Sequence, residues 1–179
     1  MKHLPTPPPA PPHPSPWNER LRKEIASARA IVILGVGNTD RGDDGAGVAA
    51  ARIVAKNIPL RLRSRVKIIL GHETPETTTG EIRAFRPDCV LILDAAIAKR
   101  RAGALFIVER ELLVEEALST HHLSLAMLVR FLEESVACRV VVLGIQPKRT
   151  DRGSPLSPPV QKAIDRLADC LREALKTKP

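Results

Sequence analysis

The sequence predicts an α/β protein with three layers: a five-stranded, mostly parallel, twisted sheet, one antiparallel edge strand, and helices on both faces. Three observations predict this fold. Short continuous apolar runs recur along the chain, which is typical of strands buried on both faces. Amphipathic stretches separate most of these runs, and this alternation is typical of a parallel sheet. One connection is too short for a helical crossover, so one strand is expected to run the other way.

The chain is predicted to divide into a short arm and a single domain. Residues 1–17 contain half of the 16 prolines. Proline fixes φ and has no amide donor, so this arm is expected to be extended or disordered. Residues 18–179 are expected to form one domain, because a chain of this length is too short for two well-packed ones.

The strands are recognised by their apolar runs and the helices by their spacing. AIVILG, VKIIL, CVLILD, ALFIVE and RVVVLGIQ predict strands at 30–35, 66–70, 89–94, 104–109 and 139–146. Helical spacing predicts helices at 18–28, 44–56, 77–85, 120–135 and 157–176. Only about nine residues separate the third strand from the fourth, less than the dozen that a crossover needs. The fourth strand is therefore expected to be antiparallel and at an edge.

Composition indicates the expected subcellular localisation. No apolar run approaches the roughly 20 residues of a membrane span, and the N-terminus lacks the apolar core of a signal peptide. The three cysteines, Cys89, Cys138 and Cys170, show no C-x-x-C spacing and do not make an even number. A cytoplasmic protein without membrane insertion, disulfides or a thiolate metal site is therefore expected.

The chain is basic, with a formal net charge of +8. Such a charge attracts nucleic acids or acidic proteins. Aromatic residues are only 2% of the chain, so no stacking platform accompanies the basic stretches, and no nucleic-acid-binding motif is present. The sequence therefore favours a solvated basic surface and no nucleic-acid partner.

The first strand leads directly into a glycine-rich loop, GVGNTDRGDDGAG, at 35–47. A dinucleotide fingerprint needs a glycine where Asp40 stands, and a P-loop needs a G-K-[ST] ending that is absent. Asp40, Asp43 and Asp44 would also repel a phosphate. The loop is therefore expected to attract cations, although one of these carboxylates is also well placed to cap the helix that follows.

Two further positions complete a possible cation site. Asp94 ends the third strand, and in open α/β sheets ligands bind beyond the carboxyl ends of the strands. His121 and His122 follow a natural helix cap in LSTHHLSL, at 118–125. Carboxylate and imidazole ligands suit zinc, nickel, cobalt or iron. Each residue taken alone also fits a solvated strand end or a surface histidine.

The sequence resembles the hydrogenase maturation proteases over nearly everything from Ala30 to the last helix. The matching blocks are ILGVGN (33–38), RGDDGAG (41–47), TPE (74–76), LILDA (91–95), STHHLSL (119–125) and LGIQP (143–147). Their order and spacing make the resemblance specific. The DDG and GIQP forms look most like the branch that serves hydrogenase-3-type, formate-hydrogenlyase-related enzymes.

The resemblance implies both an activity and a set of residues. Such enzymes remove the C-terminal extension from the large-subunit precursor of nickel–iron hydrogenases after nickel insertion. The catalytic and metal-contacting trio falls on Asp44, Asp94 and His121. Nickel, or another divalent metal in its place, would be carried by the substrate and read by the enzyme. Contacts to the substrate are expected from four further residues: Gly37, Asn38, Asp43 and Glu76.

The resemblance has one departure and leaves alternatives. Many relatives carry Asp where this chain has Leu70, which leaves Glu73 or His72 as candidate contacts near the second strand. The trio would serve equally a nickel-binding or precursor-docking factor without peptidase activity. A nucleotide-binding enzyme is disfavoured by the acidic loop. Whether a carboxylate or a metal activates the attacking water is open.

Overall fold

Five strands form one sheet in the computed structural model, which describes residues 17–110, 113 and 125–176. The strands are β1 (Ile31–Val36), β2 (Val66–His72), β3 (Cys89–Ala95), β4 (Leu105–Ile107) and β5 (Arg139–Ile145). Their order across the sheet is β2-β1-β3-β5-β4. β1, β2, β3 and β5 are parallel, and β4 pairs antiparallel with β5 at one edge. The predicted fold class is confirmed, including the antiparallel edge strand.

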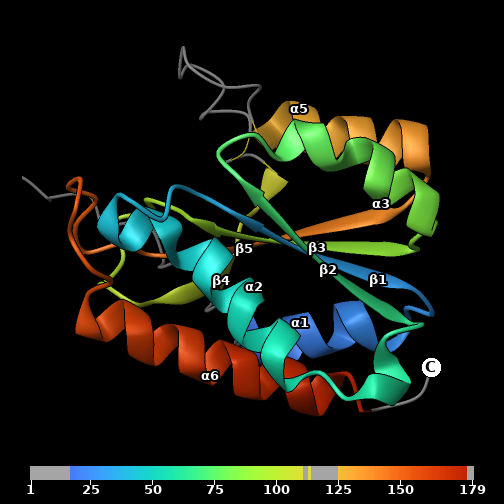
Figure 1. Ribbon diagram of the computed structural model, residues 1–179, viewed down its shortest axis with the longest axis horizontal. Coiled ribbons are helices and arrows are strands. Elements are labelled where there is room, and N and C mark those ends of the chain that lie inside the picture. The colour runs from blue at the N-terminus through green and yellow to red at the C-terminus, as the bar shows by residue number, and fades with distance from the viewer. Residues whose placement is uncertain (1–16, 111–112, 114–124, 177–179) are drawn as a thin grey trace, which may run out of the picture.

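Helices cover both faces of the sheet (Figure 1). One face carries α1 (Trp17–Ala26), α2 (Ala46–Asn57) and α6 (Pro158–Ala174). The other face carries α3 (Thr79–Phe85) and α5 (Leu125–Phe131). Short turns adjoin them: the 3-10 turns η1 (Gly42–Gly45), η2 (Leu60–Leu62) and η3 (Pro75–Thr78), and the π-helical turn η5 (Leu132–Val136).

The two helical layers explain why the strands are apolar at every position. Along β1, Ile31 and Ile33 pack into the core beneath α1, α2 and α6, whereas Val32 and Leu34 pack into the core beneath α3 and α5. Successive side chains of a strand point to opposite faces, so both sets are buried and no polar alternation remains. The continuous apolar runs were therefore a correct sign of central strands.

Several boundaries differ from those predicted. The helix expected from Asp44 begins at Ala46, because η1 comes first. The fourth strand is shorter than 104–109, and the described part of the helix expected at 120–135 ends in the π-helical turn. Trp17, assigned to the proline-rich arm, is the first residue of α1. The rest of that arm lies outside the described residues.

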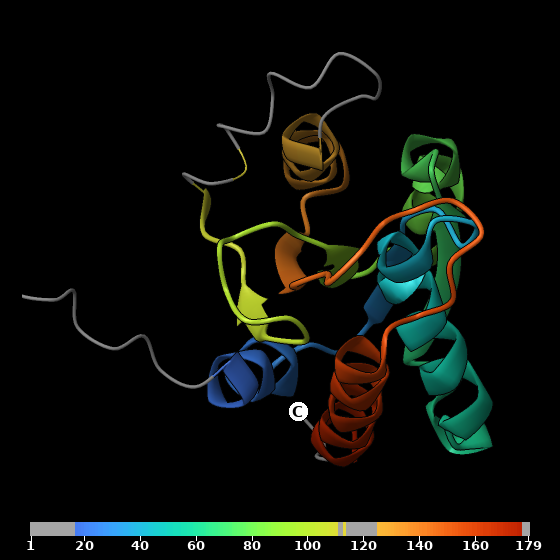
Figure 2. The same cartoon turned by 90° about the vertical axis from the view of Figure 1, so that its left-hand side faces the viewer.

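All four parallel strands end at the same side of the sheet, on the left in Figure 1. Figure 2 views the molecule from that side and shows η1 beside the segment that leads from β5 to α6. In parallel sheets this side is where ligands bind. Within the residues that the structure describes, no helix is long and apolar enough to cross a membrane.

Candidate active site at the carboxyl ends of the strands

The candidate site is the loop region at the carboxyl ends of the parallel strands, called here the carboxyl rim. The rim is made of residues 37–45 after β1, residues 73–76 after β2, Asp94 at the end of β3, and Gln146 after β5. Each predicted site residue among the described residues lies in this rim. The burial and the hydrogen bonds of each side chain determine whether it can contact a substrate.

Two glycines allow the acidic loop to lie directly on the strands. Gly37 has φ of 118°, and a Cβ atom there would lie 1.9 Å from the carbonyl oxygen of Asp44. At Gly47 a Cβ atom would lie 2.0 Å from the carbonyl oxygen of Leu93, the residue before Asp94. Only glycine fits such approaches. The start of α2 is thereby pressed against the end of β3, and η1 contacts β3, so Asp44 and Asp94 belong to one rim.

Asp44 is held by its own loop and keeps part of its surface exposed. Its Oδ2 accepts a hydrogen bond of 2.9 Å from the backbone N–H of Asn38. The side-chain amide of Asn38 donates to Oε1 of Glu73 at 2.7 Å, and its Oδ1 accepts from the N–H of Asp40 at 2.8 Å. Asn38 therefore links the loop after β1 to the end of β2. Glu73, a candidate contact in the sequence, is part of this link.

The neighbouring carboxylate has a different role. Asp43 is fully buried, and its two oxygens accept four hydrogen bonds from a segment more than a hundred residues away. The donors are the N–H groups of Lys148 (2.8 Å), Arg149 (3.1 Å) and Ser157 (2.6 Å), and the Ser157 hydroxyl (2.8 Å). The expected substrate contact from Asp43 is therefore not supported, because its carboxylate faces the protein interior.

These hydrogen bonds also settle the charge of Asp43. Burial alone raises the pKa of a carboxyl group, but the bonds from Ser157, Lys148 and Arg149 outweigh it and hold the pKa of Asp43 below its ordinary value. Asp43 is thus ionised at neutral pH. Its charge ties η1 to Ser157, the N-cap residue of α6.

Asp94 lies at the end of β3, opposite Gly144 of β5, and is partly exposed. Its Oδ1 accepts a hydrogen bond of 2.8 Å from the N–H of Ala95. The adjacent connection from β3 to β4 is held by Gln146, which is 6% exposed. The Oε1 of Gln146 accepts from the N–H groups of Ala98 (2.8 Å) and Arg100 (3.1 Å). The loop that follows Asp94 is therefore fixed to the end of β5.

The other predicted residues are distributed as follows. The N–H of Gly37 donates to the carbonyl of His72 at 2.9 Å, so Gly37 joins β1 to β2. One carboxylate oxygen of Glu76, Oε2, is buried and has no hydrogen-bond partner among the described residues. A buried oxygen of this kind is uncommon. His121 lies outside the described residues.

The structure places two residues of the predicted trio, Asp44 and Asp94, at the same rim, where η1 contacts β3. Across residues 17–110, 113 and 125–176, no three His, Cys, Asp or Glu side chains form a group suited to holding a metal. Two carboxylates are fewer ligands than a divalent cation takes. A cation at this rim therefore has to gain further ligands from an incoming molecule or from His121.

Sequence reasoning missed two residues that shape the rim. Ser157 gives two of the four hydrogen bonds to Asp43, yet in the sequence it is only a natural helix cap. Gln146 was recognised as part of LGIQP without a role. The available signal was a polar side chain directly after the apolar run of β5, a position where an amide must be hydrogen-bonded.

Replacing Asn38 by Ala is expected to lower the free energy of unfolding by about 1–2 kcal/mol, because it removes the bonds to Glu73 and Asp40. Chemical denaturation measures the change. The matched control is Glu73→Gln, which keeps an oxygen able to accept from Asn38 and should lose less than half as much. Equal losses in both variants would contradict the proposed link.

Fold and rim together define a class: an α/β protein that presents carboxylates at the carboxyl ends of its parallel strands, one on an acidic glycine-rich loop and one at the end of a central strand. Comparison with known proteins makes this specific. The family model described as hydrogenase maturation protease matches residues 52–174. The chain belongs to this family, and the resemblance seen in the sequence is confirmed.

Individual relatives agree with the family match. A hydrogenase maturation protease from Thermococcus kodakarensis has a crystal structure that superposes with a TM-score of 0.80 at 32% identity, covering 88% of this chain and 99% of the other. The hydrogenase 3 maturation protease of Escherichia coli K12 is 31% identical over 135 residues, 75% of this chain and 83% of the relative. A solution structure of an Escherichia coli endopeptidase gives a TM-score of 0.71 at 30% identity, covering 80% and 90%.

Proposed function

We propose that this protein is the endopeptidase that removes the C-terminal extension of a nickel–iron hydrogenase large-subunit precursor. The observation that carries the proposal is the meeting of Asp44 and Asp94 at one rim in a chain of the hydrogenase maturation protease family. Asp44 lies in η1 and Asp94 at the end of β3, and both are partly exposed. Their exposure supports joint action on a group that arrives from solvent.

The group that arrives is nickel already inserted into the precursor. Asp44, Asp94 and His121 contact this nickel and so place the scissile peptide bond over the rim. Nickel accepts carboxylate and imidazole ligands. The remaining ligands come with the substrate, which explains how a rim with two carboxylates engages the ion.

Two ways of activating the attacking water fit this rim. A carboxylate of Asp44 or Asp94 takes a proton from the water as a general base. Alternatively, the nickel carried by the substrate lowers the pKa of a bound water. Both require an ordered rim, and the bonds to Asp44, Asp43 and Gln146 provide that order. The three buried free cysteines fit a reducing compartment such as the cytoplasm.

The test is incubation with a precursor that carries its C-terminal extension, with and without nickel. The expected result is one cut that releases the extension from the nickel-loaded precursor and no cut in the nickel-free one. Mass spectrometry of the products measures both. Equal cleavage of the two forms would refute nickel reading. Binding without any cleavage would show a docking factor in place of a peptidase.

A further inference from the structure

A basic pocket opens next to the carboxyl rim, between the connection from β3 to β4 and the first turns of α6. Its volume is about 560 Å³. Three cationic side chains, Arg101, Lys162 and Arg166, line it together with a single carboxylate, Asp165. The proposed cleavage of the peptide bond does not use this pocket.

The walls of the basic pocket are held in place by backbone contacts. Gly103 has φ of 73°, and a Cβ atom there would lie 2.3 Å from the carbonyl oxygen of Pro159. The N–H of Gly103 donates to the carbonyl of Gln146 at 2.8 Å, and Arg166 donates to the carbonyl of Gly103 at 3.2 Å. The connection is thereby fixed against α6, and the pocket is preformed.

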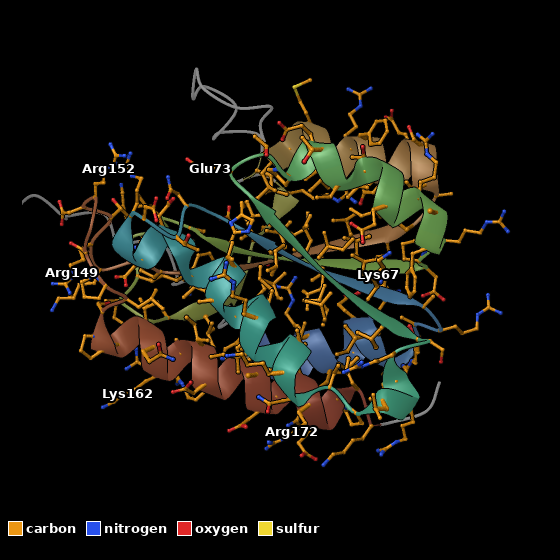
Figure 3. The ribbon with its side chains drawn as sticks, viewed as in Figure 1. Lys67, Glu73, Arg149, Arg152, Lys162 and Arg172 are labelled. Atoms are coloured by element: carbon orange, nitrogen blue, oxygen red, sulfur yellow. The ribbon has the colours of Figure 1, made fainter. Side chains whose placement is uncertain are left out.

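The charge of the basic pocket is not neutralised from within. Arg101 and Lys162 are exposed, and neither forms an ion pair with an acidic side chain in the part of the chain that the structure describes. The carboxylate of Asp165 accepts a hydrogen bond from Gln161 at 3.1 Å. Figure 3 shows Arg149 and Arg152 on the same end of the molecule as Lys162, all directed outward. These cationic side chains lie where they can attract an incoming anionic group.

Two short stretches of the chain connect the basic pocket to the rim. Pro159 lies two residues beyond Ser157, which is hydrogen-bonded to Asp43, the neighbour of Asp44. Arg101 lies in the connection that begins directly after β3, the strand that contains Asp94. The pocket therefore borders the rim through Gln146, which accepts from Gly103, and through Ser157, which donates to Asp43.

We propose that the basic pocket binds acidic side chains of the hydrogenase precursor and so docks the substrate beside the carboxyl rim. This inference rests on the proposed function. A nucleic acid fits less well, because the aromatic ring near the pocket, Phe106, is 5% exposed, lies beneath Arg100, and cannot stack on bases. Asp165 would also repel a chain of phosphates, which carries a negative charge at every unit.

The test is steady-state cleavage of the nickel-loaded precursor by the full chain with Arg101→Glu and Lys162→Glu combined. The expected result is a rise in KM of about tenfold with kcat within about twofold, because charges at an interface act on encounter and affinity. The wild-type KM should rise with salt, and the variant should lose most of that dependence. Thermal unfolding checks that the variant is folded.

The matched control is Arg61→Glu with Arg63→Glu, two exposed residues at η2, at the opposite end of the sheet. It makes the same change in net charge and should leave KM within about twofold. Equal KM values in the two double variants, or a loss confined to kcat, would overturn the inference. An oligonucleotide that binds wild type but not the pocket variant, with KM for the precursor unchanged, would overturn it as well.

Binding of the precursor is also measured directly by titration, which separates this inference from the proposed function. A wild-type protein that binds the precursor without cutting it refutes the endopeptidase. In that case the docking inference stands if the pocket variant binds about tenfold more weakly than the control, and falls if both bind equally.

Discussion

Asp44→Asn and Asp94→Asn are each expected to slow cleavage of a nickel-loaded precursor by about a thousandfold, within the range of a lost general base or a lost charge contact. Asparagine keeps the shape of aspartate but removes its charge, so nickel contact and proton transfer fail while the loop remains folded. His121→Ala is expected to act in the same direction. Single-turnover cleavage with excess enzyme measures the effect without interference from product release.

The control for this loss is Asp40→Asn, in the same loop as Asp44. Asp40 is exposed, and the bond that holds it uses its backbone N–H and not its carboxylate. The same loss of one charge should leave the rate within about twofold. An Asp44→Asn or Asp94→Asn variant that cuts at the wild-type rate would remove that residue from the catalytic site.

Asp43→Ala is expected to cost about 3–5 kcal/mol in the free energy of unfolding, the largest stability effect at the rim. The substitution leaves three N–H groups and one hydroxyl without their acceptor in a buried place. Denaturation with urea at pH 7 measures the loss. Asp44→Asn is the neighbouring control: Asp44 is partly exposed, so its change should stay below about 1 kcal/mol.

The loss of stability in Asp43→Ala is also expected to depend on pH. The pKa of Asp43 is lower in the folded protein than in the unfolded chain, so its contribution to stability is complete above about pH 4 and is lost as the pH falls through the folded-state value. The difference in unfolding free energy between wild type and Asp43→Ala should therefore be constant near neutrality and shrink in acid. A difference that grows in acid would show that the carboxyl group is protonated in the fold.

The fold was predictable because its main signals are local. A strand such as β3, buried on both faces, has to be apolar throughout, and that pattern is visible in one short window. The direction of β4 followed from the length of one connection. The start of α2 was not predictable to the residue, because the bonds that favour η1 over a helical turn come from the distant segment after β5.

The site was predictable in part for the same reason. Topology alone places Asp94 and the loop after β1 at one rim, since parallel strands end together. The family resemblance assigns the metal contact to Asp44, but composition and spacing alone do not decide which of Asp43 and Asp44 faces the solvent. Their partners decide it: Ser157 and its neighbours enclose Asp43, while Asp44 bonds within its own loop. In this adjacent pair of like residues, one side chain is thus buried and the other is partly exposed.

The hydrogen bonds that Asp43 accepts from residues 148, 149 and 157 affect when the acidic loop can fold during synthesis on the ribosome. The acidic loop is translated early. The carboxylate of Asp43 nevertheless lacks its hydrogen-bond donors until the segment before α6 has been translated and α6 has packed against α2. The acidic loop therefore reaches its final form only after this segment has been translated, because the contacts that bury Asp43 are distant in sequence.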